Sequence, residues 1–406
     1  MALTEYVNRA LHLSPSLLLA AILTACGPAV PPQPATAVPK QAAQPAAPTA
    51  ESRGVGTAPA ATAAPAATPT AAPAVKKEKT KVTIAFGLPL GNPSNPFAWI
   101  GDYLGYFDEE AVEVTFQSTG GNNAQQDAML ISGQIEAGIF GLEQVLRPAA
   151  SGKEVPARAV FNVQNRSQYE GIVLEDSDIR TTADLKGKTI AIPQLGATLE
   201  TYMSAVLKDA GLSPDDVKYL ATGIGPPMGE ALKRGEVAAA FGTRGQIGPL
   251  ELQYKFRFLP RPKFADEFIT GNVVARTSMR PEQEAGLRGY LRAYARSIVF
   301  SKENPEAAVL INWKMYPESK PKGVSEEQAL RDAVKIYTDY LSYIDKLEGK
   351  WGYMPPDKIA AYVRFLGLEG KLPNVETYYT NEWIDFINQF DEDKVREQAR
   401  NFKIAN

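Results

Sequence analysis

The chain has 406 residues and carries 46 acidic and 43 basic side chains, which give a formal net charge of −3. Without a basic excess, the composition argues against a nucleic-acid-binding protein. The single histidine, His12, and the single cysteine, Cys26, both lie near the N-terminus, so the rest of the chain has no histidine or thiolate metal ligand, no cysteine nucleophile and no Ser-His-Asp triad.

Residues 11–23 form a mostly apolar run that ends just before Cys26. The run is shorter than the roughly 20 apolar residues that a bilayer span needs, and it has the length of a signal-peptide core. The sequence Leu23-Thr24-Ala25-Cys26-Gly27 resembles a bacterial lipobox. The resemblance implies a signal peptide at 1–25, a cut before Cys26 and a diacylglyceryl group on its sulfur, so the protein would be extracytoplasmic and lipid-anchored to the cell membrane. The alternative is a chance cysteine beside an ordinary cleavage site.

Residues 26–80 form the next segment, and after Cys26 it contains no Leu, Ile, Phe, Tyr or Trp. It is built mainly from alanine, proline and threonine. Such a tract cannot bury enough apolar surface to offset its chain entropy. We therefore predict that the lipidated Cys26 is followed by a disordered tether, which would average roughly 40 Å in length as a flexible coil.

Residues 81–406 alternate strand-like runs with helical segments, which is typical of α/β units with parallel sheets. This segment has more residues than one hydrophobic core usually organises, which predicts two lobes. The first unit has expected strands at 81–87, 112–118 and 136–141, a helix from about Phe97 and a helix at 122–132. The second has expected strands at 188–194, 217–223 and 237–242 and helices at 197–211 and 227–235.

The two units end in the same pattern. "SGQIEAGIFG" at 132–141 and "RGEVAAAFG" at 234–242 each place a glycine at a helix end and close on Phe-Gly. We interpret them as two copies of one βαβαβ lobe facing each other; a coincidence of glycine caps and small-residue strands is the alternative.

Ligands of open parallel sheets bind beyond the carboxyl ends of the strands. This rule selects six loops, which would form a clamp across a cleft. They are 87–99, 118–123 and 141–144 in the first lobe, and 193–198, 223–228 and 243–249 in the second.

Several motifs of the folded part also resemble a known family. The pieces are "GYF" at 105–107, "DLKGKTIAIP" at 184–193, the two Phe-Gly strands and the C-terminal "VRFLGLEGKLPNVETYYTNEWIDF". They resemble the solute-binding proteins of nitrate, sulfonate and taurine ABC importers and their thiamine-pyrimidine and riboflavin relatives. One departure is "EEAVEV", where the family usually has Gly-Leu after the glutamates.

The resemblance implies a type II periplasmic-binding-protein fold with two Rossmann-like lobes and a ligand cleft between them. Lobe one would comprise 81–174 and 273–406, and lobe two 175–272.

Aromatic and backbone groups of the first-lobe loops are the first candidates for ligand contact. Phe97 and Trp99 could stack on a planar ligand, although Trp99 could equally be a core residue. Gly121 and Asn122 could offer backbone N–H groups, or form a plain turn in which Asn122 caps a helix. Asn92 belongs to the same set as a loop residue.

The remaining candidates are mostly polar. Glu143 and Arg244 occupy equivalent places in the two units, where they could contact ligand or form a salt bridge that closes the cleft. Arg166 and Tyr169 would face the cleft near a hinge or lie on the surface. Thr198 could cap a helix and contact ligand through its hydroxyl. Leu195 and Thr243 complete the set as members of the strand-end loops.

The sequence therefore predicts an ABC-importer binding protein, not an enzyme, that captures a small organic solute. It would deliver the solute to a permease and its ATPase, act as a monomer and need no cofactor or metal. A planar heterocycle such as a thiamine-pyrimidine precursor or riboflavin is favoured over an alkanesulfonate, taurine or nitrate. A sensing lipoprotein stays open. A thiamine-pyrimidine synthase-like enzyme is the distant alternative, because such enzymes use a histidine and a cysteine-rich motif that the folded part lacks.

Overall fold

The structure is a computed structural model that describes residues 78–195, 198–372 and 374–404. These residues belong to one of the chain's two units, Pro73–Asn406. The predicted signal peptide, Cys26 and nearly all of the predicted tether lie outside the described residues.

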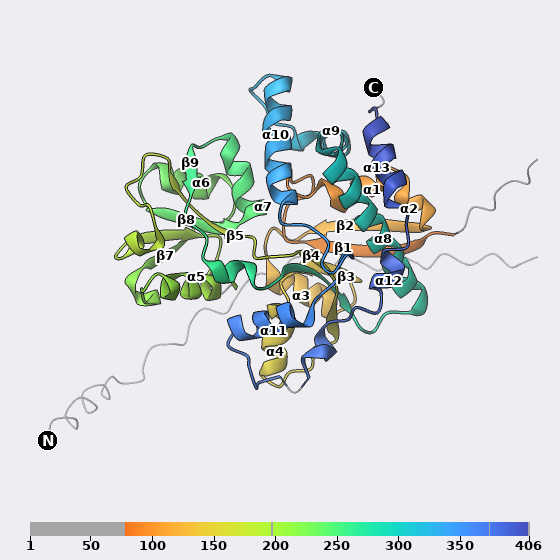
Figure 1. Ribbon diagram of the computed structural model, residues 1–406, viewed down its shortest axis with the longest axis horizontal. Helices are drawn as coiled ribbons and strands as arrows, with labels where there is room; N and C mark the ends of the chain where they lie inside the picture. Colours follow the sequence, from red (N-terminus) through yellow and green to blue (C-terminus); the bar gives the residue numbers. More distant parts are fainter. Residues whose placement is uncertain (1–77, 196–197, 373, 405–406) are drawn as a thin grey trace, which may run out of the picture. The chain divides into compact units, whose positions relative to one another are not determined.

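Two five-stranded sheets form the framework, and each mixes parallel and antiparallel strands (Figure 1). The first has the order β2-β1-β3-β10-β4 and the second β7-β6-β8-β5-β9. The strands of the first sheet are β1 Thr80–Phe86, β2 Val112–Ser118, β3 Ala137–Phe140, β4 Ala157–Gln164 and β10 Thr270–Arg276. Those of the second are β5 Tyr169–Leu174, β6 Thr189–Ile192, β7 Lys218–Ala221, β8 Ala239–Thr243 and β9 Phe256–Phe258.

The two sheets repeat one topology. In each, three parallel strands (β2-β1-β3 and β7-β6-β8) are followed by an antiparallel fourth strand, β10 or β5. A shared order with a shared antiparallel strand is more than a coincidence of helix caps, so the prediction of two α/β lobes is confirmed.

The lobe boundary differs from the predicted one. The sequence places Tyr169–Leu174 in lobe one, but this strand, β5, pairs with β8 and β9 in the second sheet. The chain therefore crosses to lobe two between Gln164 and Tyr169. The reason is topological. The antiparallel strand of each sheet directly follows a segment that crosses between the lobes, and no local sequence pattern marks such a crossing. Strand β10 returns the chain to lobe one.

Helices surround both sheets, and most belong to the first lobe. The first-lobe helices are α1 Ile100–Tyr103, α2 Tyr106–Glu109, α3 Asn123–Ile131, α4 Glu143–Ala150, α8 Pro281–Glu303, α9 Pro305–Met315, α10 Glu326–Leu341, α11 Pro356–Phe365, α12 Ile384–Ile387 and α13 Glu392–Asn401. Those of lobe two are α5 Thr198–Asp209, α6 Pro226–Lys233 and α7 Arg244–Ile247.

The expected helix from Phe97 is broken into short turns. A 3-10 turn at Pro96–Ala98 is followed by α1, and Gly105, with a φ of 78°, separates α1 from α2. Left-handed backbone of this kind favours glycine and ends a helix. The longest helix, α8, packs against β1, and its buried stripe includes Leu287, Tyr290 and Tyr294.

Hydrophobic side chains fill both faces of the first sheet. One cluster joins Val82 and Ile84 of β1 to α8, α9 and α10. A second joins Phe140 of β3 and α11 to residues of lobe two such as Ile190. Among the helices of the described ranges, none combines the length and apolar character of a membrane span.

Candidate functional site

A cavity of about 340 Å³ lies between the two lobes. All six strand-end loops contribute to its wall: Gly87, Gly121 and Gly141 from lobe one, and Pro193, Gly223 and Thr243 from lobe two. The volume falls within the usual range for small-molecule sites. The cavity is therefore where an open α/β fold places a ligand.

The wall combines aromatic rings with side-chain amides. Its aromatic members are Phe86, Phe140, Tyr169, Tyr340 and Tyr362. Its amides are Asn95, Asn123, Gln144, Gln164, Gln168, Gln194 and Gln246. A ligand here can pack an apolar or planar body on rings and form neutral hydrogen bonds around its edge.

Glu143, the first residue of α4, is the charged member of the described wall. Only 5% of it is exposed. Its Oε1 accepts a hydrogen bond from the Thr198 hydroxyl of lobe two, and its Oε2 accepts one from the Tyr362 hydroxyl. A Cβ on Gly141 would lie 1.8 Å from Glu143 Oε2, so glycine at 141 is what lets the carboxylate fold back over the loop.

Glu143 also influences its neighbours. Burial first, and then the charge of Glu143, raise the pKa of the Asp127 carboxyl on α3 to about 6. Burial raises the pKa of the Tyr169 and Tyr362 hydroxyls well above the ordinary value, and Glu143 adds to both shifts. Both tyrosines are therefore neutral hydrogen-bond donors at physiological pH.

Gln164 forms part of the cavity wall at the end of β4. Its Nε2 donates to the Tyr340 hydroxyl over 2.6 Å, whereas its Oε1 has no hydrogen-bond partner although the residue is 1% exposed. A Cβ on Gly271, where φ is 61°, would lie 1.5 Å from that oxygen. Glycine at this place in β10 therefore leaves room for the amide.

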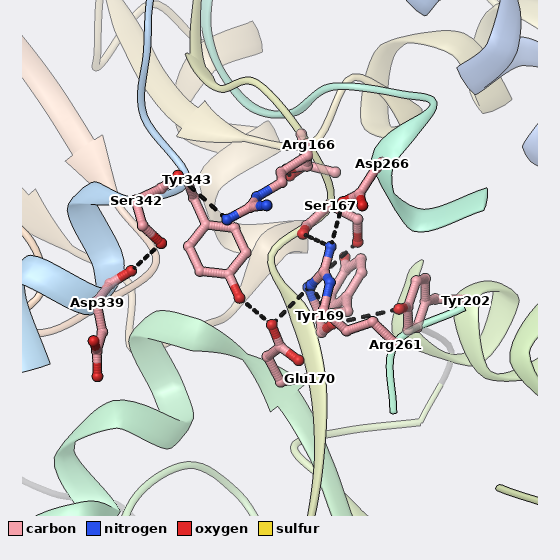
Figure 2. Close-up of polar contacts among 11 residues, drawn as sticks. Arg166, Ser167, Tyr169, Glu170, Tyr202, Arg261, Asp266, Asp339, Ser342 and Tyr343 are labelled. Carbon is pink, nitrogen blue, oxygen red and sulfur yellow. Dashed lines mark hydrogen bonds and ion pairs between the residues drawn. The ribbon is translucent and has the colours of Figure 1, made fainter. Parts of the chain in front are cut away.

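The crossing segments beside the cavity are held by a polar network, shown in Figure 2. Arg261 binds Glu170 over 2.8 Å and donates to the Ser167 carbonyl over 2.9 Å. The Tyr343 hydroxyl donates to Glu170, and the Arg166 guanidinium lies 4.7 Å from the centre of the Tyr343 ring. Both crossings and the end of α10 are thus fixed at one point, the expected location of a hinge.

The structure brings five of the predicted site residues into the wall. They are Gly121, Glu143, Tyr169, Thr198 and Thr243. That they contact a ligand stays a prediction.

The prediction that Phe97 and Trp99 stack on a ligand is wrong. Trp99 is 1% exposed, and its indole Nε1 donates to Asn312 Oδ1 over 2.7 Å. Phe97 is equally buried and stacks against Tyr337 and Tyr340. Both rings belong to the buried cluster of lobe one and not to the cavity wall.

Arg244 and Arg166 also lie outside the cavity wall. Arg244 pairs with Glu251 at 2.6 Å and with Asp339 at 2.8 Å, so the predicted salt bridge to Glu143 is wrong. Arg166 donates to the Ser342 carbonyl within the polar network of Figure 2. Two carboxylates thus hold Arg244, and a backbone carbonyl accepts from Arg166.

Three loop residues remain outside the wall. Asn122 is the N-cap of α3, where it accepts from the Gln125 N–H over 3.0 Å. The Asn92 side chain accepts from the Ser94 N–H over 2.9 Å, and Leu195 is 60% exposed. Local turn and cap contacts thus occupy both asparagines.

Sequence reasoning missed Gln164, Gln246, Tyr340 and Tyr362. Gln246 had a local signal, because Thr243 and Gln246 have capping-box spacing and the Thr243 N–H donates to Gln246 Oε1 over 2.9 Å. The two tyrosines come from helices far along the chain, and nothing in their surroundings marks them. Across the described ranges, no group of three or more His, Cys, Asp or Glu side chains is placed to hold a metal ion.

A family model described as NMT1/THI5 like matches residues 92–308, which include loops of both lobes. The chain belongs to this family. No curated protein matches the chain in sequence.

Solved structures place the NMT1/THI5-like chain in the periplasmic-binding-protein fold. A Candida albicans protein described by that fold matches with a TM-score of 0.56 at 12% identity, covering 77% of this chain and 98% of its own. A Bordetella bronchiseptica protein matches with 0.58 at 18%, covering 80% and 99%. The alkanesulfonate-binding protein of Xanthomonas axonopodis, bound to MOPS, matches with 0.54 at 16%, covering 75% and 99%.

Proposed function

We propose that the protein is the extracytoplasmic solute-binding component of an ABC importer, which captures a small organic solute and delivers it to a permease. The observation that carries the proposal is the cavity between two repeated lobes, lined by all six strand-end loops. Family membership supports it. A thiamine-pyrimidine synthase-like activity is the distant alternative, and the absence of histidine and cysteine after Cys26 argues against it.

A planar heterocycle, such as a thiamine-pyrimidine precursor or riboflavin, is the favoured ligand. The support no longer comes from Trp99 but from the tyrosine and phenylalanine rings of the wall and its many amides. An alkanesulfonate, taurine or nitrate is the alternative, and the alkanesulfonate-binding neighbour favours it.

A thermal-shift screen of vitamins, pyrimidines, sulfonates and oxyanions tests capture. A ligand at 100 times its dissociation constant should stabilise the protein by about 2.7 kcal/mol. Gln246→Ala, in the wall, should weaken the response, whereas Gln125→Ala, on the exposed side of α3, should not. If no solute shifts the melting temperature, solute capture is refuted.

Lipid anchoring at Cys26 is the second part of the proposal, and the lipobox-like sequence supports it. Cys26→Ser should leave the chain uncut by the lipoprotein peptidase and unlabelled by a palmitate analogue. Normal processing of the variant with unchanged partition into detergent would rule out the anchor.

A further inference from the structure

The cavity wall has an unbalanced charge. Glu143 is its acidic residue, and none of the described wall residues is Lys or Arg. Within the described part of the chain, Glu143 takes part in no salt bridge, although many other acidic side chains do. A buried carboxylate without a counter-charge is unfavourable, and a ligand can supply what the protein does not.

The neighbouring guanidinium groups lie outside the described wall. Arg147, one turn along α4, is exposed and donates to the Thr201 hydroxyl over 2.7 Å, and its charge opposes the rise in the Tyr362 pKa. Arg244 is held between Glu251 and Asp339. An anionic ligand would therefore meet the Glu143 carboxylate without a cation in the described wall to offset it.

The wall also has unused hydrogen-bond acceptors. A carboxylate offers about four acceptor positions, and the two hydroxyls of Thr198 and Tyr362 occupy two of those on Glu143. Gln164 Oε1 is a second, independent acceptor, buried and without a donor. A bound molecule that satisfies both must bring N–H or O–H donors.

Aromatic rings complete the environment. Tyr169, Tyr340 and Tyr362 line the same cavity, and the faces of such rings attract cations. The half-buried carboxyl of Asp127, close enough to feel the charge of Glu143, adds to the negative field.

We infer that the cavity selects a small organic solute bearing a protonated nitrogen group, such as an amine or amidine, and that Glu143 is the specificity-determining residue for that group. Gln164 Oε1 accepts a further N–H from the solute, while the rings pack on its body. The inference rests on the proposed function, and it narrows the ligand class from small organic solutes in general to cationic ones.

A series of probes with one skeleton and three charges tests the inference. Benzamidine, benzamide and benzoate have nearly the same size and carry a positive, zero and negative charge. Calorimetric titration of the full chain at pH 7.5 should give at least about tenfold tighter binding of benzamidine than of benzoate, a difference of about 1.4 kcal/mol. n-Butylamine and butanesulfonate provide a second, aliphatic pair.

Glu143→Gln should abolish the preference for benzamidine over benzamide, because the amide keeps an acceptor but loses the charge. Glu200→Gln is the matched control: it makes the same change on α5 two residues beyond Thr198, outside the described wall, and should retain the preference. Should Glu143→Gln fail to fold, the wild-type probe series still tests the preference for a cation. Gln164→Met, which removes the second acceptor, then tests the hydrogen bond to the solute.

The possible outcomes distinguish failure of this inference from failure of the proposed function. Benzoate or butanesulfonate binding as tightly as its cationic partner would overturn the inference while leaving solute capture intact. An unchanged benzamidine preference in Glu143→Gln would remove Glu143 from specificity. Absence of binding by every probe and by the wider solute screen would refute the proposed function itself.

Discussion

Trp99 shows how a single residue can be misplaced by a sound local argument. It follows a strand end and a proline-rich loop, where rings can face a ligand, yet it packs edge-to-face against Phe86 and Tyr316 in the core. A strand-end position fixes where the backbone emerges, but not which way a large ring turns. The indole ring lies in the core because it is buried there between Phe86 and Tyr316.

Trp99→Ala should therefore affect stability and spare ligand affinity. Emptying a buried tryptophan site costs about 3–5 kcal/mol, and the Asn312 amide would lose the indole donor as well. Urea unfolding should show this loss, while titration of the folded fraction with a screened ligand gives an unchanged dissociation constant. The reverse pattern, intact stability with lost binding, would return Trp99 to the ligand site.

Asp127 should make stability depend on pH. Its pKa in the folded chain is about 6, above the ordinary 3.8, because burial and then Glu143 disfavour the charge. The folded state thus binds the proton more tightly, so this stabilisation is complete below pH about 4 and is lost as the pH rises through about 6.

Asp127→Asn should accordingly raise the free energy of unfolding at pH 7.5 by about 1 kcal/mol, a value reduced for partial exposure. At pH below about 4 the gain should vanish. Urea titrations at both pH values measure the difference, with the exposed Asp176→Asn as control. A gain that is equal at both pH values would contradict the assignment.

At the scale of elements, the pairing of β4 with β10 shapes the cavity wall. Gly271 combines a left-handed φ of 61° with the close approach of Gln164. Gly152 has a similar φ of 79° but open space where a Cβ would lie. The two positions separate backbone strain from side-chain displacement.

Gly152→Ala should cost about 1–2 kcal/mol from backbone strain alone. Gly271→Ala should cost about 3–5 kcal/mol, because the strain is joined by overpacking against Gln164. It should also weaken ligand binding, since the displaced amide belongs to the wall. Denaturant unfolding and titration measure the two effects; equal losses for both variants would show that Gln164 moves aside without cost.

Elements of the repeated units were predictable because apolar strand runs alternate with helical segments along the chain, and the carboxyl ends of the strands identified the loops of the wall. The antiparallel crossings were not, as the misassigned β5 shows. Pairing across a lobe boundary depends on contacts far apart in the chain. The same limit hid Tyr340 and Tyr362, which reach the cavity from α10 and α11, far along the chain from the strand-end loops.

At the scale of the whole folded unit, charged groups of the two lobes meet beside the cavity. Lys335 and Asp339 lie on α10, which packs on the core of lobe one, while Arg244 and Glu251 belong to lobe two. Arg244 pairs with Asp339 at 2.8 Å, and Lys335 pairs with Glu251 at 2.7 Å. Binding proteins of this fold close around ligands by hinge motion, so these pairs should favour the closed arrangement.

Asp339→Asn should shift the lobes toward separation. Arg244 keeps its pairing with Glu251, so no buried charge is left alone. Losing a partly exposed pair costs about 0.5–1 kcal/mol, which should weaken ligand affinity roughly twofold to fivefold. The effect should shrink in high salt, because screening already weakens the pair in the wild type.

Distances between labels on the two lobes can test this shift without a ligand. In a Cys26→Ser background, cysteines replacing the exposed Lys153 and Lys218 would carry the labels. Asp339→Asn should increase the population of long distances at low salt. Glu327→Gln provides the matched control, because it breaks an exposed ion pair with Arg331 on the same helix that does not cross between lobes. Identical distance distributions for Asp339→Asn and wild type would mean that the cross-lobe charges follow closure without stabilising it.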